Sequence, residues 1–178
     1  MRRDEILRAL AALGAELAAH GLVADLYVVG GAAITLAYDE RRATRDIDAV
    51  FVPKNEVYAA VARVAAALDL PEGWLNDAVK GFLPGPDSFP TKMFDMPGLR
   101  CEVASAETVL VLKCLAHRLG EDDDDVVLLA GQLGLDTADD VLDLVERVGH
   151  PRLLTPQVEL FVRSVMDVSE APDSGQDP

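Results

Sequence analysis

The chain has 178 residues, and 50% of them are hydrophobic, which is enough to bury the core of one domain or of a small α/β domain with a helical appendage. This composition excludes global disorder, and the longest apolar runs are too short to cross a bilayer. The formal net charge of −15 excludes polyanion binding over the whole surface, because phosphate groups are neutralised by Lys and Arg.

In the first half of the chain, the spacing of apolar residues predicts alternating helices and strands. The predicted elements are a helix over 4–20 that ends at Gly21, a strand over 25–29, a small-residue helix that begins at Gly30-Gly31, a strand over 46–52, a helix over 55–68 and a short helix over 71–80. An arginine-rich loop, residues 39–45, precedes the second strand.

In the second half, a loop rich in Pro and Gly leads to a hairpin and then to helices only. The predicted elements are strands over 91–94 and 99–104, a helix that Ser105 caps and that runs to about 118, and helices over about 123–133, 137–148 and 152–166. We expect an α/β (α+β) core with a small mixed sheet over residues 1–118, a C-terminal helical bundle over 119–167, and a disordered tail over 168–178.

The central motif is Asp46-Ile-Asp48 at the start of the second strand. Residues two apart in a strand share a face, so both carboxylates are expected to project together. Two neighbouring carboxylates repel each other, and a hard divalent ion such as Mg²⁺ removes that cost and bridges to phosphate oxygens. Upstream, Gly30-Gly31 lets backbone amides approach a phosphate at a helix N-terminus. Together, the two motifs predict a site for a nucleoside triphosphate.

This combination resembles the DNA polymerase β-like nucleotidyltransferase superfamily, and it is similar to the bacterial abortive-infection or toxin-type branch and its relatives. The shared segments are Val29-Gly-Gly-Ala-Ala33, Arg45-Asp-Ile-Asp-Ala-Val-Phe51, Trp74-Leu-Asn-Asp-Ala-Val-Lys-Gly-Phe82, Leu99-Arg-Cys-Glu-Val-Ala-Ser105, and Lys113-Cys-Leu-Ala-His-Arg118 with Asp124-Asp125-Val126. The resemblance covers roughly residues 20–135.

The resemblance implies the nucleotidyltransferase fold and the transfer of a nucleoside monophosphate from a triphosphate to a hydroxyl acceptor. It implies that Asp46 and Asp48 hold two Mg²⁺ ions, with Glu102 as the third metal ligand or the base that activates the acceptor. Gly30, Gly31, Arg45 and Lys113 would contact the nucleotide. The family setting is the toxin of a toxin–antitoxin pair, with tRNA or a protein as the acceptor and a cognate antitoxin as a partner.

Two features depart from the superfamily pattern. Residue 32 is Ala where many relatives carry Ser or Thr, so one hydroxyl contact to phosphate is missing. The segment between Gly31 and Asp46 is also long for the superfamily. Both features favour, as the alternative, a catalytically weak or inactive binding module with the same fold. A glycosyltransferase also uses an Asp-x-Asp metal site, but it usually needs a larger domain.

Several residues have a second interpretation. Asp46 is also compatible with a cap, Asp48 with an ion pair to Arg45, and Arg45 itself with screening of the two carboxylates. Asp95 is the second choice for the third carboxylate. Lys113 lies among apolar residues, which favours a specific role for its charge over a solvent-facing position.

Other residues are expected to be structural. Trp74 is expected in the core or as a lid anchor more than as a base-stacking platform, and Arg118 is expected to pair with the acids at 121–125. The run Asp122–Asp125 is interpreted mostly as a solvated helix start, and Cys101 and Cys114 as buried thiols in a reducing compartment.

The negative charge is uneven. Residues 119–178 carry 15 acids and three bases, so this third of the chain is expected to repel nucleic acid or to dock a basic partner. Any contact with nucleic acid is expected near Arg41, Arg42 and Arg45. No signal peptide follows Met1, so we expect a cytoplasmic protein with no membrane partner.

Overall fold

The computed structural model describes residues 1–149 and 151–170. The chain divides into two compact units, Met1–Ser105 and Ala106–Pro178. The boundary predicted from the sequence, at residue 118, would instead assign the helix after Ser105 to the first unit.

The first unit contains a five-stranded mixed sheet with the order β3-β2-β1-β5-β4. The strands are β1 (Ala24–Val28), β2 (Ile47–Val52), β3 (Leu75–Asn76), β4 (Thr91–Met96) and β5 (Leu99–Val103). Strand β1 is central, and it pairs antiparallel with β2 and parallel with β5. Strand β4 forms the predicted hairpin with β5. The mixed α/β class predicted from the sequence is confirmed.

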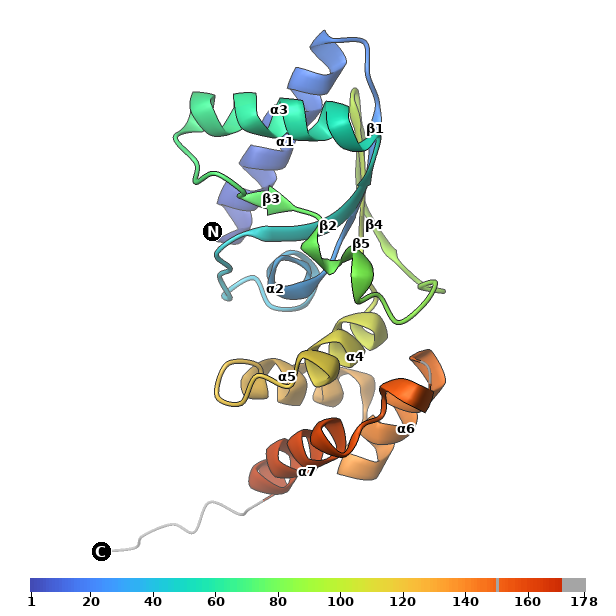
Figure 1. Ribbon diagram of the computed structural model, residues 1–178. Helices are drawn as coiled ribbons and strands as arrows, with labels where there is room; N and C mark the ends of the chain where they lie inside the picture. Colours follow the sequence, from blue (N-terminus) through green and yellow to red (C-terminus); the bar gives the residue numbers. More distant parts are fainter. Residues whose placement is uncertain (150, 171–178) are drawn as a thin grey trace, which may run out of the picture. The chain divides into compact units, whose positions relative to one another are not determined.

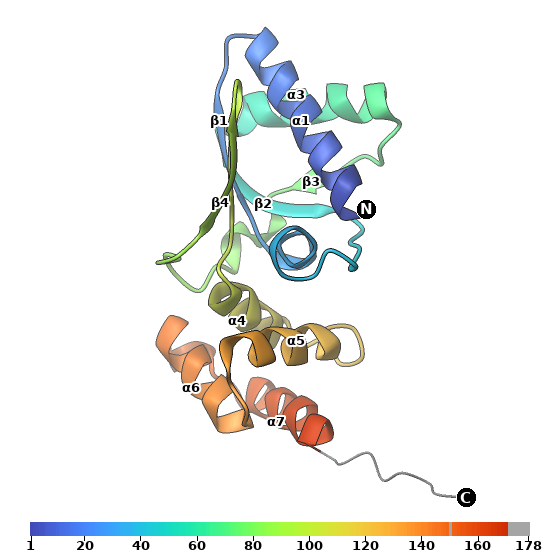
Figure 2. The ribbon, with the colours of Figure 1, turned by 180° about the vertical axis from the view of Figure 1, so that it is seen from behind.

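Helices α1 (Arg3–Ala19) and α3 (Lys54–Leu68) lie on one face of this sheet (Figures 1 and 2). The buried strand residues alternate with exposed or half-buried ones, as expected for a sheet with one covered face. Leu26, Phe51 and Cys101 are buried, whereas Asp25, Arg100 and Glu102 are exposed. The sheet therefore presents a polar face opposite the face that its helices cover.

The segment after β1 carries the glycine motif. Helix α2 (Gly30–Ala33) continues directly into a π-helical turn, Ile34–Tyr38. Ala32, Ala33 and Ile34 are buried, so this short helix packs into the core through its small residues. The loop that follows leads to β2 and to the Asp-x-Asp motif.

The second unit is helical. Its elements are α4 (Ala106–Ala116), α5 (Asp123–Leu133), α6 (Ala138–Val148), a 3₁₀ turn at Pro151–Leu153, and α7 (Pro156–Glu170). Thr137 caps α6, because its Oγ1 accepts from Asp140 N at 3.2 Å while Asp140 Oδ2 accepts from Thr137 N at 3.0 Å. None of the helices in the described part of the chain combines the length and apolar character needed to span a membrane.

Three sequence predictions differ from the structure. The predicted helix over 71–80 is wrong: this segment forms a turn, strand β3 and a 3₁₀ turn, η2 (Ala78–Gly81). Strand β2 begins at Ile47, so Asp46 immediately precedes it. Residues 168–170 are the end of α7, not tail, and the rest of the predicted tail, 171–178, lies outside the described residues.

Candidate active site

The glycine turn and the Asp-x-Asp motif meet at the end of β1. Gly30 has a φ of +62°, a conformation that L side chains rarely adopt. A Cβ at this position would lie 3.2 Å from Asp48 Oδ2, so the carboxylate of Asp48 lies directly against the turn. Gly30 is therefore required both by its backbone conformation and by the approach of Asp48.

Asn76 places Asp46 on the same side of the sheet as Asp48. Strand β3 pairs parallel with β2, and Asn76 is the register partner of Asp48. The Asn76 side chain donates from Nδ2 to Asp46 Oδ2 over 3.1 Å. Because register partners project from the same face, Asn76 and the carboxylate it bonds, Asp46, lie on the same side of the sheet as Asp48, which contacts Gly30. Both carboxylates are half-buried.

Thr44 closes the other side of the turn. Its Oγ1 donates to the backbone carbonyl of Asp46 over 3.0 Å, and a Cβ at Gly31 would lie 2.9 Å from Thr44 Oγ1.

Arg45 is exposed, and no hydrogen bond or ion pair joins its side chain to another described residue. The alternative ion pair between Arg45 and Asp48 is therefore not formed. Arg45 lies next to Asp46 with its charge directed to solvent.

Glu102 lies on the polar face of the sheet, apart from the acid pair. It is opposite Tyr27 in the β1–β5 register, and Tyr27 is opposite Val50 in the β1–β2 register. Because β1 separates their strands, Glu102 and Asp48 have Cα atoms about 10 Å apart or more, as the strand spacing requires. Within residues 1–149 and 151–170, no group of three His, Cys, Asp or Glu side chains is arranged to hold a metal ion. Metal ligation by Glu102 remains a prediction.

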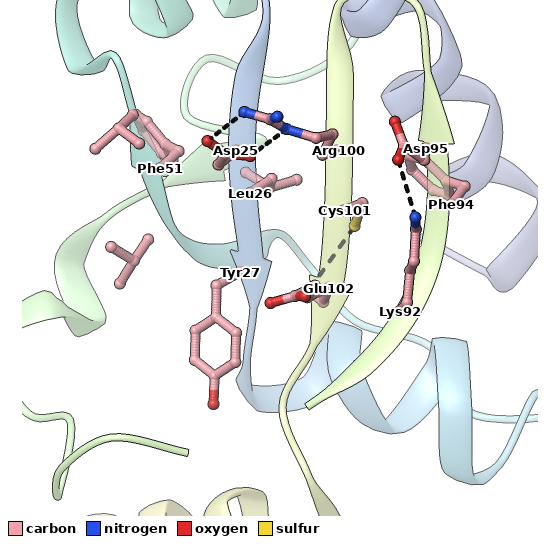
Figure 3. A pocket seen from close by; sticks show the side chains of 12 residues that line it. Asp25, Leu26, Tyr27, Phe51, Lys92, Phe94, Asp95, Arg100, Cys101 and Glu102 are labelled. Atoms are coloured by element: carbon pink, nitrogen blue, oxygen red, sulfur yellow. Dashed lines mark hydrogen bonds and ion pairs between the residues drawn. The ribbon is translucent and has the colours of Figure 1, made fainter. Parts of the chain in front are cut away.

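Glu102 lines a cavity of about 380 Å³ on the polar face of the sheet (Figure 3). Two ion pairs border this cavity: Arg100 with Asp25, over 2.5 and 2.8 Å, and Lys92 with Asp95, over 2.9 Å. The Lys92 ammonium holds the pKa of the Asp95 carboxyl below its usual value. Asp95, the second choice for the third carboxylate, is therefore already paired with Lys92 on its own strand, β4.

Lys113 lies in the second unit, where two aspartates share its charge. Its Nζ is 2.6 Å from Asp122 Oδ1 and 2.8 Å from Asp125 Oδ2, and the residue is only 8% exposed. Arg118 Nε is 2.9 Å from Asp122 Oδ2, which confirms the predicted pairing of Arg118. Burial raises the pKa of the Asp122 carboxyl, but hydrogen bonds from Arg118 and Lys113 outweigh burial, so the pKa lies below its ordinary value.

The interpretation of Asp122–Asp125 as a mostly solvated helix start is wrong for Asp122 and Asp125, which are buried. The reason is the nonlocal pairing with Lys113, which links α4 to α5. A contact between Lys113 and a triphosphate would have to compete with these two carboxylates. The role of Lys113 in nucleotide binding therefore remains a prediction.

Sequence reasoning missed Asn76 and Asp87. Asp87 lies in the loop over 77–90 and accepts hydrogen bonds from Tyr27 Oη over 2.7 Å and from the backbone N–H of Ser105 over 2.7 Å. Burial raises the pKa of the Asp87 carboxyl, but these hydrogen bonds lower it below its ordinary value. An isolated Asp between two prolines, Pro86 and Pro90, gives a weak signal of such an anchor.

Three predicted structural roles are confirmed. Trp74 is 1% exposed, and its Nε1 donates to the Val61 carbonyl over 3.2 Å, so it belongs to the core. Cys101 and Cys114 are free, buried thiols, and burial raises the pKa of each to about 12. Cys101 also lines the cavity beside Glu102.

A mixed sheet with a glycine turn facing an Asp-x-Asp strand is the arrangement that defines a nucleotidyltransferase-type domain. Residues 5–143 match the family described as "Nucleotidyltransferase of unknown function (DUF6036)". The match covers more than half of the chain, and the chain belongs to this family. No curated protein and no solved structure matches it.

Proposed function

We propose that this protein transfers a nucleoside monophosphate from a nucleoside triphosphate to a hydroxyl acceptor and releases pyrophosphate. The proposal is carried by one observation: Asp48 lies against Gly30, with Asp46 held beside it by Asn76. This arrangement supplies carboxylates on one side of the phosphates and backbone amides on the other side.

The donor set fits Mg²⁺ that arrives with its nucleotide. Mg²⁺ is usually bound by one or two protein carboxylates together with substrate phosphates, not by an all-protein cage. The two half-buried carboxylates held together at the glycine turn match that pattern. Asp46 and Asp48 would hold the ions, two of which are expected, and the ions would neutralise charge on the transferred phosphoryl group.

The residues of the chain supply positioning and charge. The N–H groups that follow the glycine turn would hold a phosphate, and Arg45, which is exposed beside Asp46, would stabilise charge that builds up on the leaving pyrophosphate. Glu102 would take the proton of the acceptor hydroxyl, or ligate a metal ion, from its place beside the cavity on the polar face. Lys113 would also stabilise the negative charge that builds up on the phosphates, if it left its two aspartate partners for the nucleotide.

The biological setting rests on resemblance alone. Toxin-type relatives suggest tRNA or a protein as the acceptor, a cognate antitoxin as the partner, and action in the cytoplasm. The second candidate function is a catalytically weak or inactive nucleotide-binding module. It is favoured by Ala32, which is 1% exposed and offers no hydroxyl to a phosphate, and by the separation of Glu102 from the acid pair.

The test uses Asp46→Asn and Asp48→Asn, each incubated with Mg²⁺, one labelled triphosphate at a time, and bulk tRNA or protein. We expect transfer to be lost, because each variant lacks one of the two carboxylates that would hold the metal ions. The fold should remain intact, because the repulsion between the two carboxylates is removed. Asp69→Asn is the matched control, because Asp69 is exposed at the end of α3, and Asn accepts its left-handed conformation. Wild-type protein that binds nucleotide but never transfers it would leave the binding module as the function.

A further inference from the structure

Phe82 is an exposed aromatic residue on the loop that follows strand β3. Phe82 is 73% exposed, although a phenylalanine side chain has no polar group that could form a hydrogen bond with water. It follows η2, and its backbone N–H donates to the Val79 carbonyl over 2.8 Å. The turn therefore fixes the backbone of a residue whose ring has no partner in the core.

The turn before Phe82 is anchored to the acid pair through Asn76. The Asn76 side chain uses both ends of its amide: Nδ2 donates to Asp46, and Oδ1 accepts from the backbone N–H of Ala78 over 3.0 Å. Strand β2 and η2 are also in contact. One side chain thus sets the position of the metal-binding carboxylate and the start of the turn that presents Phe82.

Further bonds hold the two sides of the loop. Asp77 accepts from Tyr58 Oη over 2.6 Å and pairs with Lys54 Nζ over 2.6 Å, which fixes η2 to helix α3. On the other side, Asp87 fixes the loop to Tyr27 and Ser105. Phe82 therefore lies in a segment anchored on both sides, so the exposure of its ring is a property of a fixed backbone.

We propose that Phe82 is the platform on which the base of the nucleoside triphosphate stacks. This inference rests on the proposed function. The turn over 78–81 extends about 8 Å at the rise of a 3₁₀ helix, which is of the order of the distance from the phosphates of a nucleotide to its base. An aromatic ring stacks on any base, because every base has a π-face, and a purine offers the larger one.

If the base stacks on Phe82, the affinity for a nucleoside triphosphate has two separate contributions, one from its phosphates and one from its base. Asp48 and Gly30 act on the phosphates, whereas Phe82 acts on the base. Inorganic tripolyphosphate has the phosphates without a base, so it reports the first contribution alone. Phe89 provides the matched control, because it is 77% exposed on the same loop but lies beyond the Asp87 anchor.

The experiment is isothermal titration calorimetry of the wild-type chain, Phe82→Ala, Phe82→Tyr, Phe89→Ala and Asp48→Asn. Each protein is titrated with ATP, with UTP and with tripolyphosphate in the presence of Mg²⁺. For Phe82→Ala, we expect a loss of ATP affinity of roughly 5- to 100-fold, a smaller loss for UTP, and no change for tripolyphosphate. Phe82→Tyr and Phe89→Ala should bind ATP as the wild type does, and Asp48→Asn should weaken all three ligands.

Two results would overturn the assignment of Phe82 and leave the nucleotide site in place. The first is wild-type ATP affinity in Phe82→Ala together with weakened binding in Asp48→Asn. The second is an equal loss in Phe82→Ala and Phe89→Ala, which would indicate a general effect of the loop. If the wild-type chain binds neither ATP, UTP nor tripolyphosphate, both the stacking platform and the proposed function are wrong.

Discussion

Asn76 and Asp46 are 30 positions apart in the sequence, and the Nδ2 of Asn76 donates to Oδ2 of Asp46 over 3.1 Å. The bond connects the edge strand β3 to the residue that precedes β2. A carboxylate that must ligate a metal needs a fixed orientation, and a neutral amide provides it without adding charge. Asn76 is therefore a positioning residue for the candidate site.

We expect Asn76→Ala to lower transfer activity by about 10- to 100-fold, the range found when the hydrogen-bond partner of a metal ligand is removed. The effect should appear as a higher Mg²⁺ requirement, because Asp46 loses its orientation and not its charge. Steady-state rates measured over a Mg²⁺ series test this prediction. Asn55→Ala, an exposed position on α3, is the control and should leave the Mg²⁺ requirement unchanged.

Gly30→Ala is expected to damage the site more than the fold. A side chain in the left-handed conformation costs about 1–2 kcal/mol, and the new Cβ would lie 3.2 Å from Asp48 Oδ2, so the carboxylate must move. A displacement of this kind is expected to reduce the rate about 100-fold. Rates and urea midpoints measured on the same sample separate the two effects.

Gly131→Ala is the control for that substitution. Gly131 lies inside α5, and a Cβ there meets no atom within 4 Å. The change should raise the free energy of unfolding by up to about 1 kcal/mol, because Ala is the better helix former. An unaltered rate in Gly30→Ala would contradict the contact between the turn and Asp48.

Lys113→Met is expected to reduce the free energy of unfolding by about 3 kcal/mol, because it leaves the buried carboxylates of Asp122 and Asp125 without their shared cation. Arg118→Ala should cost less than about 1 kcal/mol, since its side chain is 57% exposed. Urea denaturation measures both. If Lys113→Met kept its stability and lost nucleotide binding, the ion pairs would be incidental and Lys113 would be a phosphate ligand.

Acid is expected to destabilise the protein through Asp87 and Asp122. Both have a pKa in the folded chain that is lower than the ordinary value. A group of this kind contributes stability that is complete above its unfolded pKa and is lost as the pH falls through its folded pKa. We therefore expect no loss from these groups at neutral pH and a growing loss below about pH 4.

Urea denaturation at a series of pH values tests the acid prediction. Asp122→Asn and Asp87→Asn should each be less stable than the wild type at neutral pH and should lose less stability on acidification. A variant that keeps the full acid dependence of the wild type would show that its carboxyl is not one of the groups responsible.

The sequence predicts the elements of the fold correctly where the pattern lies within a few neighbouring residues. The apolar spacing in α1, α3, α5 and α6 predicts helices close to those in the structure, and the glycine turn and the Asp-x-Asp strand are recognised from adjacent residues. The last helix, α7, begins at Pro156 and not at the predicted residue 152, because a 3₁₀ turn occupies Pro151–Leu153. In contrast, β3 has two residues and is defined by its pairing with β2, so the local pattern of residues 71–80 predicts a helix instead. Asn76 was missed for the same reason.

Contacts between residues that are far apart in the sequence are the second kind of feature that the sequence does not predict. Apolar neighbours indicate a specific role for Lys113. Four consecutive acids, however, are typical of an exposed helix start, so the sequence predicts solvent-facing positions for its partners Asp122 and Asp125. The position of Glu102, one strand away from β2 across β1, depends on sheet order, which the alternation of a single strand does not encode.

The buried position of Trp74 has a practical consequence. It is the single tryptophan of the chain, and the three tyrosines, Tyr27, Tyr38 and Tyr58, also belong to the unit Met1–Ser105. Intrinsic fluorescence therefore reports on the sheet-containing unit alone, whereas far-UV circular dichroism detects the helices of both units. Recording both signals on one sample would show whether the two units melt as one cooperative body or in succession.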